Sequence, residues 1–414
     1  MNFSINTEIS SSQSTNREEH TIVKEIDSFD RERVRIEKIK IQIKFTSDQK
    51  IIYQQNGEIL RQVECKDVHE KPELFNNMDQ IGNLYWQGQY GKNKKKEGIW
   101  IAFWNKKLLN NVGGYYKEGQ KQGLWNDLFL NYMNQVQIFE TGEYYNGLRI
   151  GKWNYIYYCQ IDLIIKLFVG GGLYNDNGEK QGKWIELDEG FYDDKKITYC
   201  GEYNKNGKKV GIWDIMYSQR IEKVSYKHIL KNYKGKYKQI YCGGGSYDQE
   251  GNQIKNGKWV ELDEKFSYSS QITYYGQYDI YGRKTGKWDI MYCGLDQMKY
   301  SQIGGGSYDQ KGNQKKIGQW VELIQEFDYW KQITYYGEYN INGMKVGRWN
   351  TMYCKYDKKE QKQMQIQIRI FSLVVVDCMM KKEIRKRLES GQNWMKGFLQ
   401  KKKSLIMENI IQMV

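Results

Sequence analysis

A repeated glycine–tryptophan motif restricts what this chain can fold into more than any other feature. Nine tryptophans have a glycine two positions earlier and a Gly-x-Tyr segment further upstream: Trp100, Trp125, Trp153, Trp184, Trp213, Trp259, Trp288, Trp320 and Trp349. Most intervals between them are similar in length, and the interval from Trp213 to Trp259 is clearly longer. A recurring period of this kind is typical of repeat proteins, in which each unit is stable only when it packs on its neighbours.

The later copies of the motif alternate between two types of unit. Residues 243–262 and 304–323 begin with Gly-Gly-Gly-Ser-Tyr-Asp-Gln, and we call them triple-glycine units. Residues 272–292 and 333–353 begin with Ile-Thr-Tyr-Tyr-Gly, and we call them ITYY units. A triple-glycine unit and the ITYY unit after it recur together with a constant period, and residues 170–217 form a third, shorter pair.

One unit has the pattern of a β-hairpin. Alternate residues of Ile272–Tyr278 share one face and are mostly aromatic or β-branched, a glycine-containing turn follows at 279–284, and Trp288–Tyr292 alternates again. Gly276 on the same face leaves room for an aromatic ring from a neighbouring strand. A single hairpin is marginally stable, so we predict an all-β fold in which residues 86–354 form an elongated single-layer array of nine hairpins. The aromatic side chains would be its core, and a platform for stacking a ligand is the alternative.

The repeat also resembles a known family. The segment from Tyr335 to Trp349 contains Tyr-Tyr-Gly-Glu-Tyr, Asn-Gly-Met-Lys and Gly-Arg-Trp, and residues 199–213 and 274–288 match it. This pattern resembles the MORN repeat, in particular its variant form, over about 88–353, although the units here are longer and a tryptophan follows the last glycine. The resemblance implies a twisted single-layer sheet of hairpins. It also implies a scaffold at membranes, junctions or the cytoskeleton.

The segment before the repeats predicts a small cap. Residues 1–20 are polar and we expect them to be disordered, whereas 21–37 are highly charged with a weak helical periodicity. Isoleucines then alternate with polar residues from Ile39 to Phe45, which predicts a half-buried strand. Pro72 suits the first position of a helix that would reach about Gln80. We interpret residues 21–85 as a cap of helix and strand for the first repeat, with a separate binding module as the alternative.

The tail at 355–414 contains a trace of the repeat in another reading frame. With AT-rich codons, residues 374–380 read from their third nucleotide give Gly-Gly-Gly-Leu-Tyr-Asp, and residues 404–414 give Thr-Tyr-Tyr-Gly-Glu-Tyr-Asn-x-Asn-Gly. The hidden glycine and the hidden tryptophan have the same separation as Gly243 and Trp259. We hypothesise that 373–414 is an out-of-frame translation of one more repeat pair. The rival is a genuine basic tail that binds nucleic acid or membrane.

The source of the chain is also suggested by a resemblance. The match between the repeat and the other reading frame of residues 373–414 improves if Gln392 and Gln412 are encoded by reassigned stop codons. Together with the single proline and the many Lys, Asn, Ile and Tyr residues, this resembles a ciliate protein.

The charge of the chain suggests alternative partners. The formal net charge is +14, and the densest basic clusters are Lys92–Lys96 and 231–238. Such clusters favour an anionic membrane surface, of the phosphoinositide type, or nucleic acid. The tail from 373 onward accounts for part of the charge, which makes nucleic acid the weaker alternative.

No catalytic, cofactor-binding or metal-binding site is predicted. The three histidines, His20, His69 and His228, are too scattered for a metal cluster, and the seven cysteines form no CxxC pair. We interpret Cys293 and Cys354 as small buried side chains at a repeat position, reduced inside the cell.

Three recurring motifs resemble functional sites, and we interpret each as structural. The glycine runs at 170–172, 243–245 and 304–306 lack the Gly-Lys-Ser/Thr of a phosphate loop and are expected to be strand-entry or bulge glycines. Asp248–Gly251 and Asp309–Gly312 lack the ligand set of an EF-hand and are expected to be turns. Asp263-Glu264 is expected to be exposed.

These observations predict a non-catalytic protein inside the cell. The N-terminus has no apolar core of a signal peptide, so we expect a cytoplasmic location, with membrane or cytoskeletal association implied by the resemblance. We expect a scaffold or protein-interaction role, with no cofactor and with other proteins as partners. Binding to an anionic membrane or to nucleic acid through the basic clusters is the alternative.

Overall fold

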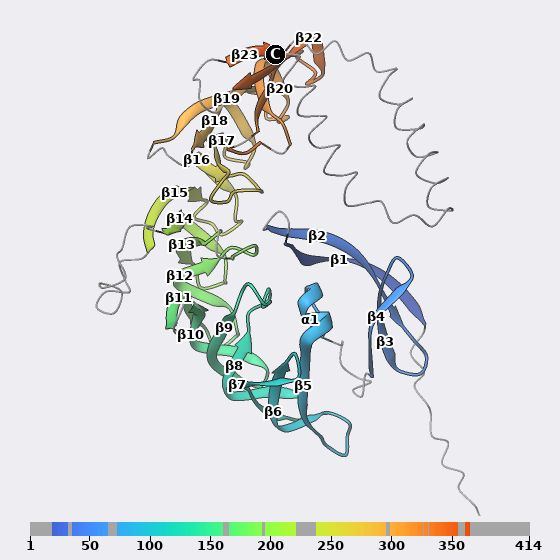
Figure 1. The fold of residues 1–414 in the computed structure, drawn as a ribbon. Coiled ribbons are helices and arrows are strands. Elements are labelled where there is room, and N and C mark those ends of the chain that lie inside the picture. Colours follow the sequence, from blue (N-terminus) through green and yellow to red (C-terminus); the bar gives the residue numbers. More distant parts are fainter. Residues whose placement is uncertain are drawn as a thin grey trace, which may run out of the picture. The chain divides into compact units, whose positions relative to one another are not determined.

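The structure is a computed structural model that describes residues 19–31, 35–64, 73–159, 165–192, 195–220, 237–294, 299–325, 327–329, 331–354 and 361–364. Strands make up almost all of its regular structure, which confirms the predicted all-β class. The elements form two sheets, one of four strands near the N-terminus and one long antiparallel sheet that contains the repeats (Figure 1).

The first sheet has the strand order β1-β2-β3-β4 and is antiparallel throughout. Its strands are β1 (His20–Asp30), β2 (Arg35–Phe45), β3 (Lys50–Gln55) and β4 (Glu58–Glu64). The strand predicted from the alternating isoleucines is β2, where Ile41 and Ile43 are buried and Lys40 and Gln42 are exposed. The apolar face of β2 therefore packs into the core of this sheet, as the alternation requires.

The weak helical periodicity of residues 21–37 was misleading, because this segment contributes to β1 and to the start of β2. The charged residues pair across the two strands: Lys38 with Asp27 at 2.7 Å, and Lys40 with Glu25 at 3.7 Å. Opposite charges on directly facing strand positions stabilise a sheet. Such pairing depends on a partner strand, so it cannot be detected from the periodicity of residues within one segment.

The helix predicted from Pro72 to about Gln80 lies further along the chain. The structure has a short helix α1 (Met78–Asn83), and Pro72 is outside the described residues. Asn77 caps α1, since its side chain accepts a hydrogen bond from the Gln80 amide at 2.8 Å, and the Gln80 side chain accepts one from the Asn76 amide at 3.1 Å. This reciprocal arrangement is a form of the capping box and fixes where the helix begins.

The long sheet contains nine consecutive hairpins, and the repeat tryptophan lies on the second strand of each. Each strand from β5 to β22 pairs antiparallel with the next. The strands are β5 (Leu84–Tyr90), β6 (Lys96–Trp104), β7 (Lys107–Lys117), β8 (Gln120–Leu128), β9 (Ile138–Tyr145), β10 (Leu148–Cys159), β11 (Ile165–Tyr174), β12 (Lys180–Leu187), β13 (Ile197–Tyr203), β14 (Lys209–Arg220), β15 (Tyr237–Tyr247), β16 (Lys255–Leu262), β17 (Gln271–Tyr278), β18 (Lys284–Cys293), β19 (Ser301–Tyr308), β20 (Lys316–Leu323), β21 (Gln332–Tyr339) and β22 (Lys345–Cys354). A short strand, β23 (Gln361–Met364), comes later in the chain.

The triple glycines form bulges, as the sequence predicted. In β19 the strand register shifts between Gly305 and Ser307, and Gly305 has a φ of 125°. A Cβ at Gly305 would lie 2.2 Å from the Trp288 carbonyl oxygen, so no larger residue fits there without a shift of the backbone. Because Gly171 and Gly244 repeat this arrangement, the glycine run is a structural feature of the unit.

Loops at the opposite end of the strands from the hairpin turns complete a second apolar stripe. Phe266 packs edge-on against Tyr217, and Phe327 packs in the same way against Tyr292 one repeat pair later. Successive loops also bond to each other, since the Ser270 hydroxyl donates to the Phe327 carbonyl at 3.0 Å. These two successive repeat pairs are therefore joined through loops as well as through strands.

Candidate functional site: the aromatic and charged ladder

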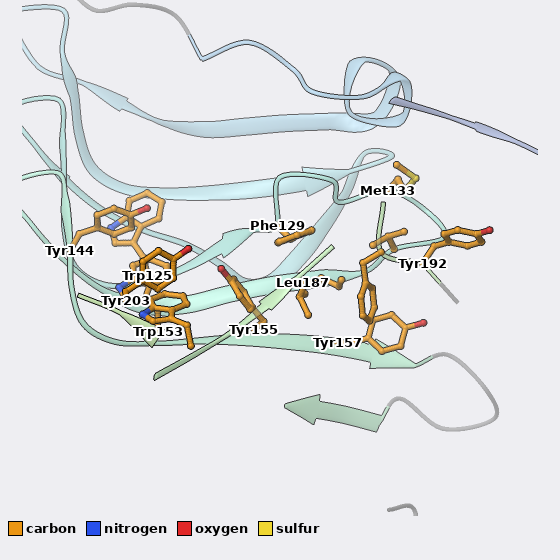
Figure 2. Close-up of a cluster of buried hydrophobic side chains, with 14 of the residues drawn as sticks. Trp125, Phe129, Met133, Tyr144, Trp153, Tyr155, Tyr157, Leu187, Tyr192 and Tyr203 are labelled. Carbon is orange, nitrogen blue, oxygen red and sulfur yellow. The ribbon is translucent and has the colours of Figure 1, made fainter. Parts of the chain in front are cut away.

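Eighteen aromatic rings form one continuous ladder along a single face of the long sheet. Tyrosines from the Gly-x-Tyr segments alternate with the repeat tryptophans, from Tyr90 and Trp100 to Tyr339 and Trp349. Neighbouring ring centroids are 5.0 to 6.4 Å apart and every contact is edge-on, a favourable geometry for aromatic pairs. Figure 2 shows four of these rings, Trp125, Tyr144, Trp153 and Tyr203, gathered at one end of the strands. Eight of the nine tryptophans are 1% to 4% exposed, as expected of a core.

A glycine lies beneath each of the nine tryptophan rings. A Cβ at Gly276 would be 2.1 Å from the Trp288 ring, and the other eight glycines of the Gly-x-Tyr segments have equivalent distances of 2.2 to 2.5 Å. The predicted space for a ring from the neighbouring strand is therefore confirmed. In seven of the nine units the indole nitrogen also donates to a carbonyl of the first strand, for example Trp213 to Glu202 at 3.2 Å.

A basic side chain lies over every tryptophan of the ladder. It is always four residues earlier in the chain, at the start of the second strand, and its charged group is 3.9 to 5.0 Å from a ring centroid of the indole. Lys96, which the sequence assigned to a basic surface cluster, is one of these residues and contacts both Trp100 and Tyr116. The sequence pattern shows a Lys or Arg at this position in all nine units, and it was not used in the prediction.

Three carboxylates each bridge two of these lysines. Glu261 pairs with Lys255 and with Lys284, the latter at 2.8 Å, and accepts a hydrogen bond from the Tyr278 hydroxyl at 2.7 Å. Burial alone would raise the pKa of Glu261, but the hydrogen bonds from Lys255, Lys284 and Tyr278 outweigh it and hold the pKa below its usual value. Glu186 and Glu322 have the same arrangement at the same spacing.

The first half of the array uses a variant of this arrangement. Asp127 accepts from Lys121 at 2.7 Å and from the Tyr144 hydroxyl at 2.8 Å. Glu140 is buried and pairs with Arg149. Burial raises the pKa of Glu140, and the nearby guanidinium opposes that effect without cancelling it. Charged groups in the ladder are thus neutralised by each other in both halves.

A cavity of about 1980 Å³ lies along the ladder face. Acidic residues outnumber basic residues in its lining, although the whole chain has a positive net charge. Its lining includes residues of β9, β10 and β12 to β16, loops between hairpins and residues of β1 and β2. Eleven Asp or Glu residues line it, against eight Lys or Arg. A surface of this composition does not attract a polyanion, because the local charge is opposite to that of the whole chain.

The acidic motifs singled out in the sequence are mainly structural. Asp263 is half-buried and accepts a hydrogen bond from Tyr274 at 2.7 Å, so the expectation that both residues of Asp263-Glu264 are exposed holds only for Glu264. Asp248 accepts from the amides of Asn252 and Ile254, and Asp309 accepts in the same way from Asn313 and Lys315, which confirms two turns. Among the residues that the structure describes, no three His, Cys, Asp or Glu side chains form a group that could hold a metal ion.

Cys293, one of the two cysteines interpreted as buried repeat positions, is a buried reduced thiol, as expected. Cys242 and Cys293 are buried, and burial raises the pKa of the Cys242 thiol to about 12, which makes it unreactive at neutral pH. Cys354 ends β22. His69, His228, residues 231–236 of the 231–238 cluster and the tail from 365 onward lie outside the described residues.

Comparison with known proteins does not assign the chain to a family. No family model matches the sequence, and no curated protein matches it significantly. Over the residues that the structure describes, no helix is long and apolar enough to cross a membrane.

Proposed function

We propose that this chain is a non-catalytic scaffold that binds other proteins through the outer face of the array, opposite the ladder. The residue directly before each repeat tryptophan projects onto this outer face. It is apolar and strongly exposed in three units: Ile99 at 71%, Leu124 at 81% and Ile212 at 69%. Exposed apolar side chains that gather on one surface are typical of protein-binding sites, and this observation carries the proposal.

Three exposed side chains of the outer face, two of them from this position, lie on successive strands. Ile99 on β6 is directly opposite Tyr115 on β7, and Leu124 is on β8, the next strand. Neighbouring strands are about 4.8 Å apart, so the three side chains form one surface. We call Ile99, Tyr115 and Leu124 the outer apolar patch.

The ladder face supports the non-catalytic part of the proposal. A general acid or base needs a carboxyl or imidazole that can exchange a proton with a substrate. The carboxylates of the ladder are instead occupied: Glu261 holds two lysines and a tyrosine hydroxyl, and the same setting recurs along the array. We interpret these residues as structural.

Proximity labelling in the native cell tests the proposal, with three baits of equal expression. They are the natural chain, the variant Ile99→Ser/Leu124→Ser, and a control variant Ile341→Ser/Met344→Ser in a hairpin turn where both side chains are also exposed, at 84% and 57%. We expect a defined set of neighbours that the patch variant loses and the control retains. Identical neighbours for all three baits would contradict a role for the patch.

Binding to an anionic membrane is the second candidate function, because five units have a basic residue directly before the tryptophan. Lys152, Lys183, Lys258, Lys287 and Arg348 are all exposed there. Each basic residue near an anionic surface contributes about 1 kcal/mol. Sedimentation with phosphatidylserine and phosphoinositide vesicles at low and high salt tests this, and no binding at low salt rejects it. A flat gel-shift titration with single-stranded RNA would remove the nucleic-acid alternative.

A further inference from the structure

The last hairpin of the array ends in a surface that is covered in every equivalent unit before it. We call Trp349, Thr351 and Tyr353 on β22 the terminal ladder face. Trp349 is half-buried, whereas Trp288 and Trp213 at the same position of the two earlier ITYY units are 3% and 2% exposed.

The rest of the terminal ladder face shows the same difference. Tyr353 is half-buried, but its equivalents Tyr292 and Tyr217 are 5% and 3% exposed. Lys345, which lies over Trp349, has half of its side chain exposed, compared with a quarter for Lys284 over Trp288. The loss of cover therefore extends along the whole strand and is not a property of one side chain.

The earlier units show what covers this surface. In each, the next strand belongs to a triple-glycine unit, whose third glycine is directly opposite the tryptophan: Gly245 opposite Trp213, and Gly306 opposite Trp288. The tyrosine two residues later then continues the ladder, with ring centroids 6.4 Å apart for Trp213 and Tyr247 and 6.2 Å apart for Trp288 and Tyr308.

In the part of the chain that the structure describes, no ring of a next strand continues the ladder beyond Trp349. Within the described residues its indole contacts the ring of Tyr339, and the ladder stops there. The next strand in the chain, β23, has the sequence Gln-Lys-Gln-Met, with neither the glycines nor the tyrosine that a covering strand requires.

We propose that the terminal ladder face is the docking site for one further repeat pair, and that the coding sequence of residues 373–414 supplies it in another reading frame. The order of units requires a triple-glycine unit after an ITYY unit, and the hidden sequence has Gly-Gly-Gly-Leu-Tyr-Asp first and Thr-Tyr-Tyr-Gly-Glu-Tyr second.

The length of the connecting segment also fits this proposal. In the other reading frame, the first glycine of the triple-glycine run lies at the position of Val374. The interval from Trp349 to this position is longer than the interval from Trp288 to Gly304. It is shorter than the interval from Trp213 to Gly243. A further repeat pair could therefore be joined to β22 in the way that earlier pairs are joined, whether or not the chain is a scaffold.

Mass spectrometry of the protein from its native cells, together with sequencing of the transcript, tests the occupant. We expect C-terminal peptides with the hidden sequence, including Thr-Tyr-Tyr-Gly-Glu-Tyr. Peptides from residues 373–414 as printed, with no hidden-frame peptides, would overturn the proposal.

Hydrogen exchange tests the docking itself on two full-length proteins, the present chain and one in which the frame of 373–414 is restored. We expect exchange of the β22 amides to slow at least tenfold on restoration and to reach the rate of β18, which serves as the internal reference. A third protein, with valine in place of the third hidden glycine, should lose that protection, because the equivalent glycines Gly245 and Gly306 lie beneath the tryptophan rings of their own units and leave no space for a side chain.

Two results would overturn the docking proposal. One is β22 exchange that does not change on restoration while β18 remains protected. The other is a concentration-dependent dimer of the present chain that protects β22, measured by light scattering, which would make a second copy the occupant.

Discussion

The two ends of the array are built from the same repeat but are finished differently. At the N-terminal end, the Arg61 guanidinium donates to the carbonyls of Gln80, Ile81 and Leu84 at 2.7 to 3.3 Å and lies over the rings of Phe75 and Tyr85. At the C-terminal end, the described residues provide no comparable cover for Trp349.

This difference shows where the stability of a unit comes from. Trp100 in the first hairpin of the array is 4% exposed, like the internal tryptophans, although no hairpin of the long sheet precedes its own. The last hairpin has the same motif and a half-buried tryptophan. The motif therefore forms the hairpin, whereas the burial of its aromatic face depends on the next unit of the array.

Replacement of a ladder tryptophan should give the largest effect and should distinguish the interior from the C-terminal end. Trp288→Ala removes a ring that packs between Tyr278 and Tyr308, so we expect a loss of about 3–5 kcal/mol in unfolding free energy. Trp349→Ala should lose about half as much, because its ring has one aromatic neighbour, Tyr339, among the described residues. Urea denaturation of both variants measures this, and equal losses would contradict the difference between the two positions.

Ladder glycines should show the same contrast at a smaller scale. Gly276→Val forces a side chain into the Trp288 ring, and we expect a loss of about 2–3 kcal/mol from overpacking. Gly337→Val makes the equivalent clash with Trp349, whose ring can move toward solvent, so a loss of about 1 kcal/mol is expected. The contrast is wrong if thermal melts of the two variants shift by the same amount.

The N-terminal cap can be weakened by one substitution. Arg61→Met keeps much of the apolar stem and removes the three charge-assisted hydrogen bonds, which should reduce stability by about 2 kcal/mol. We expect hydrogen exchange in β5 to accelerate toward the rate of β22. Unchanged exchange in β5 would show that Arg61 is not what closes this end.

The bridging carboxylates predict an acid-dependent stability. Burial alone would raise the pKa of Glu322, but hydrogen bonds from Lys316, Lys345 and Tyr339 outweigh it and lower the pKa to about 2. A depressed pKa in the folded state stabilises the protein above the unfolded value of about 4.3, and this contribution disappears as the pH falls through the folded value. Unfolding midpoints measured from pH 5 to pH 2 should therefore fall.

In the variant Glu322→Gln, the unfolding midpoint should decrease less between pH 5 and pH 2. The substitution should also reduce the unfolding free energy at pH 7 by about 1 kcal/mol. Glu261→Gln should lose somewhat more at pH 7, because Lys284 is better shielded than Lys345. The same slope in the natural chain and in both variants would show that these bridges do not contribute.

The smallest effect is expected on the outer face. Leu124 is 81% exposed, so Leu124→Ser should change the unfolding free energy by less than about 0.5 kcal/mol. A loss above about 1 kcal/mol would mean that Leu124 contributes to the fold, and the outer apolar patch would then lose its interpretation as a binding surface.

Much of the array was predictable from the sequence because its rules are local. Strand alternation, the glycine under the ring and the bulge glycines each depend on residues close together in the chain. The bridge between Lys255, Glu261 and Lys284 was missed, since it joins neighbouring hairpins. The Lys or Arg four residues before each tryptophan is nevertheless visible in the sequence. Strand β1 was missed for a similar reason, because its charged side chains are explained only by their partners on β2. No outer-face site was predicted, since exposure results from packing.

Site-resolved hydrogen exchange over the full-length chain compares both ends and the interior of the array in one sample. We expect the amides of β5 and β6 to exchange as slowly as those of β17 and β18, and the amides of β22 to exchange at least tenfold faster. Protection of β22 equal to that of β18, or fast exchange at both ends, would contradict this expectation.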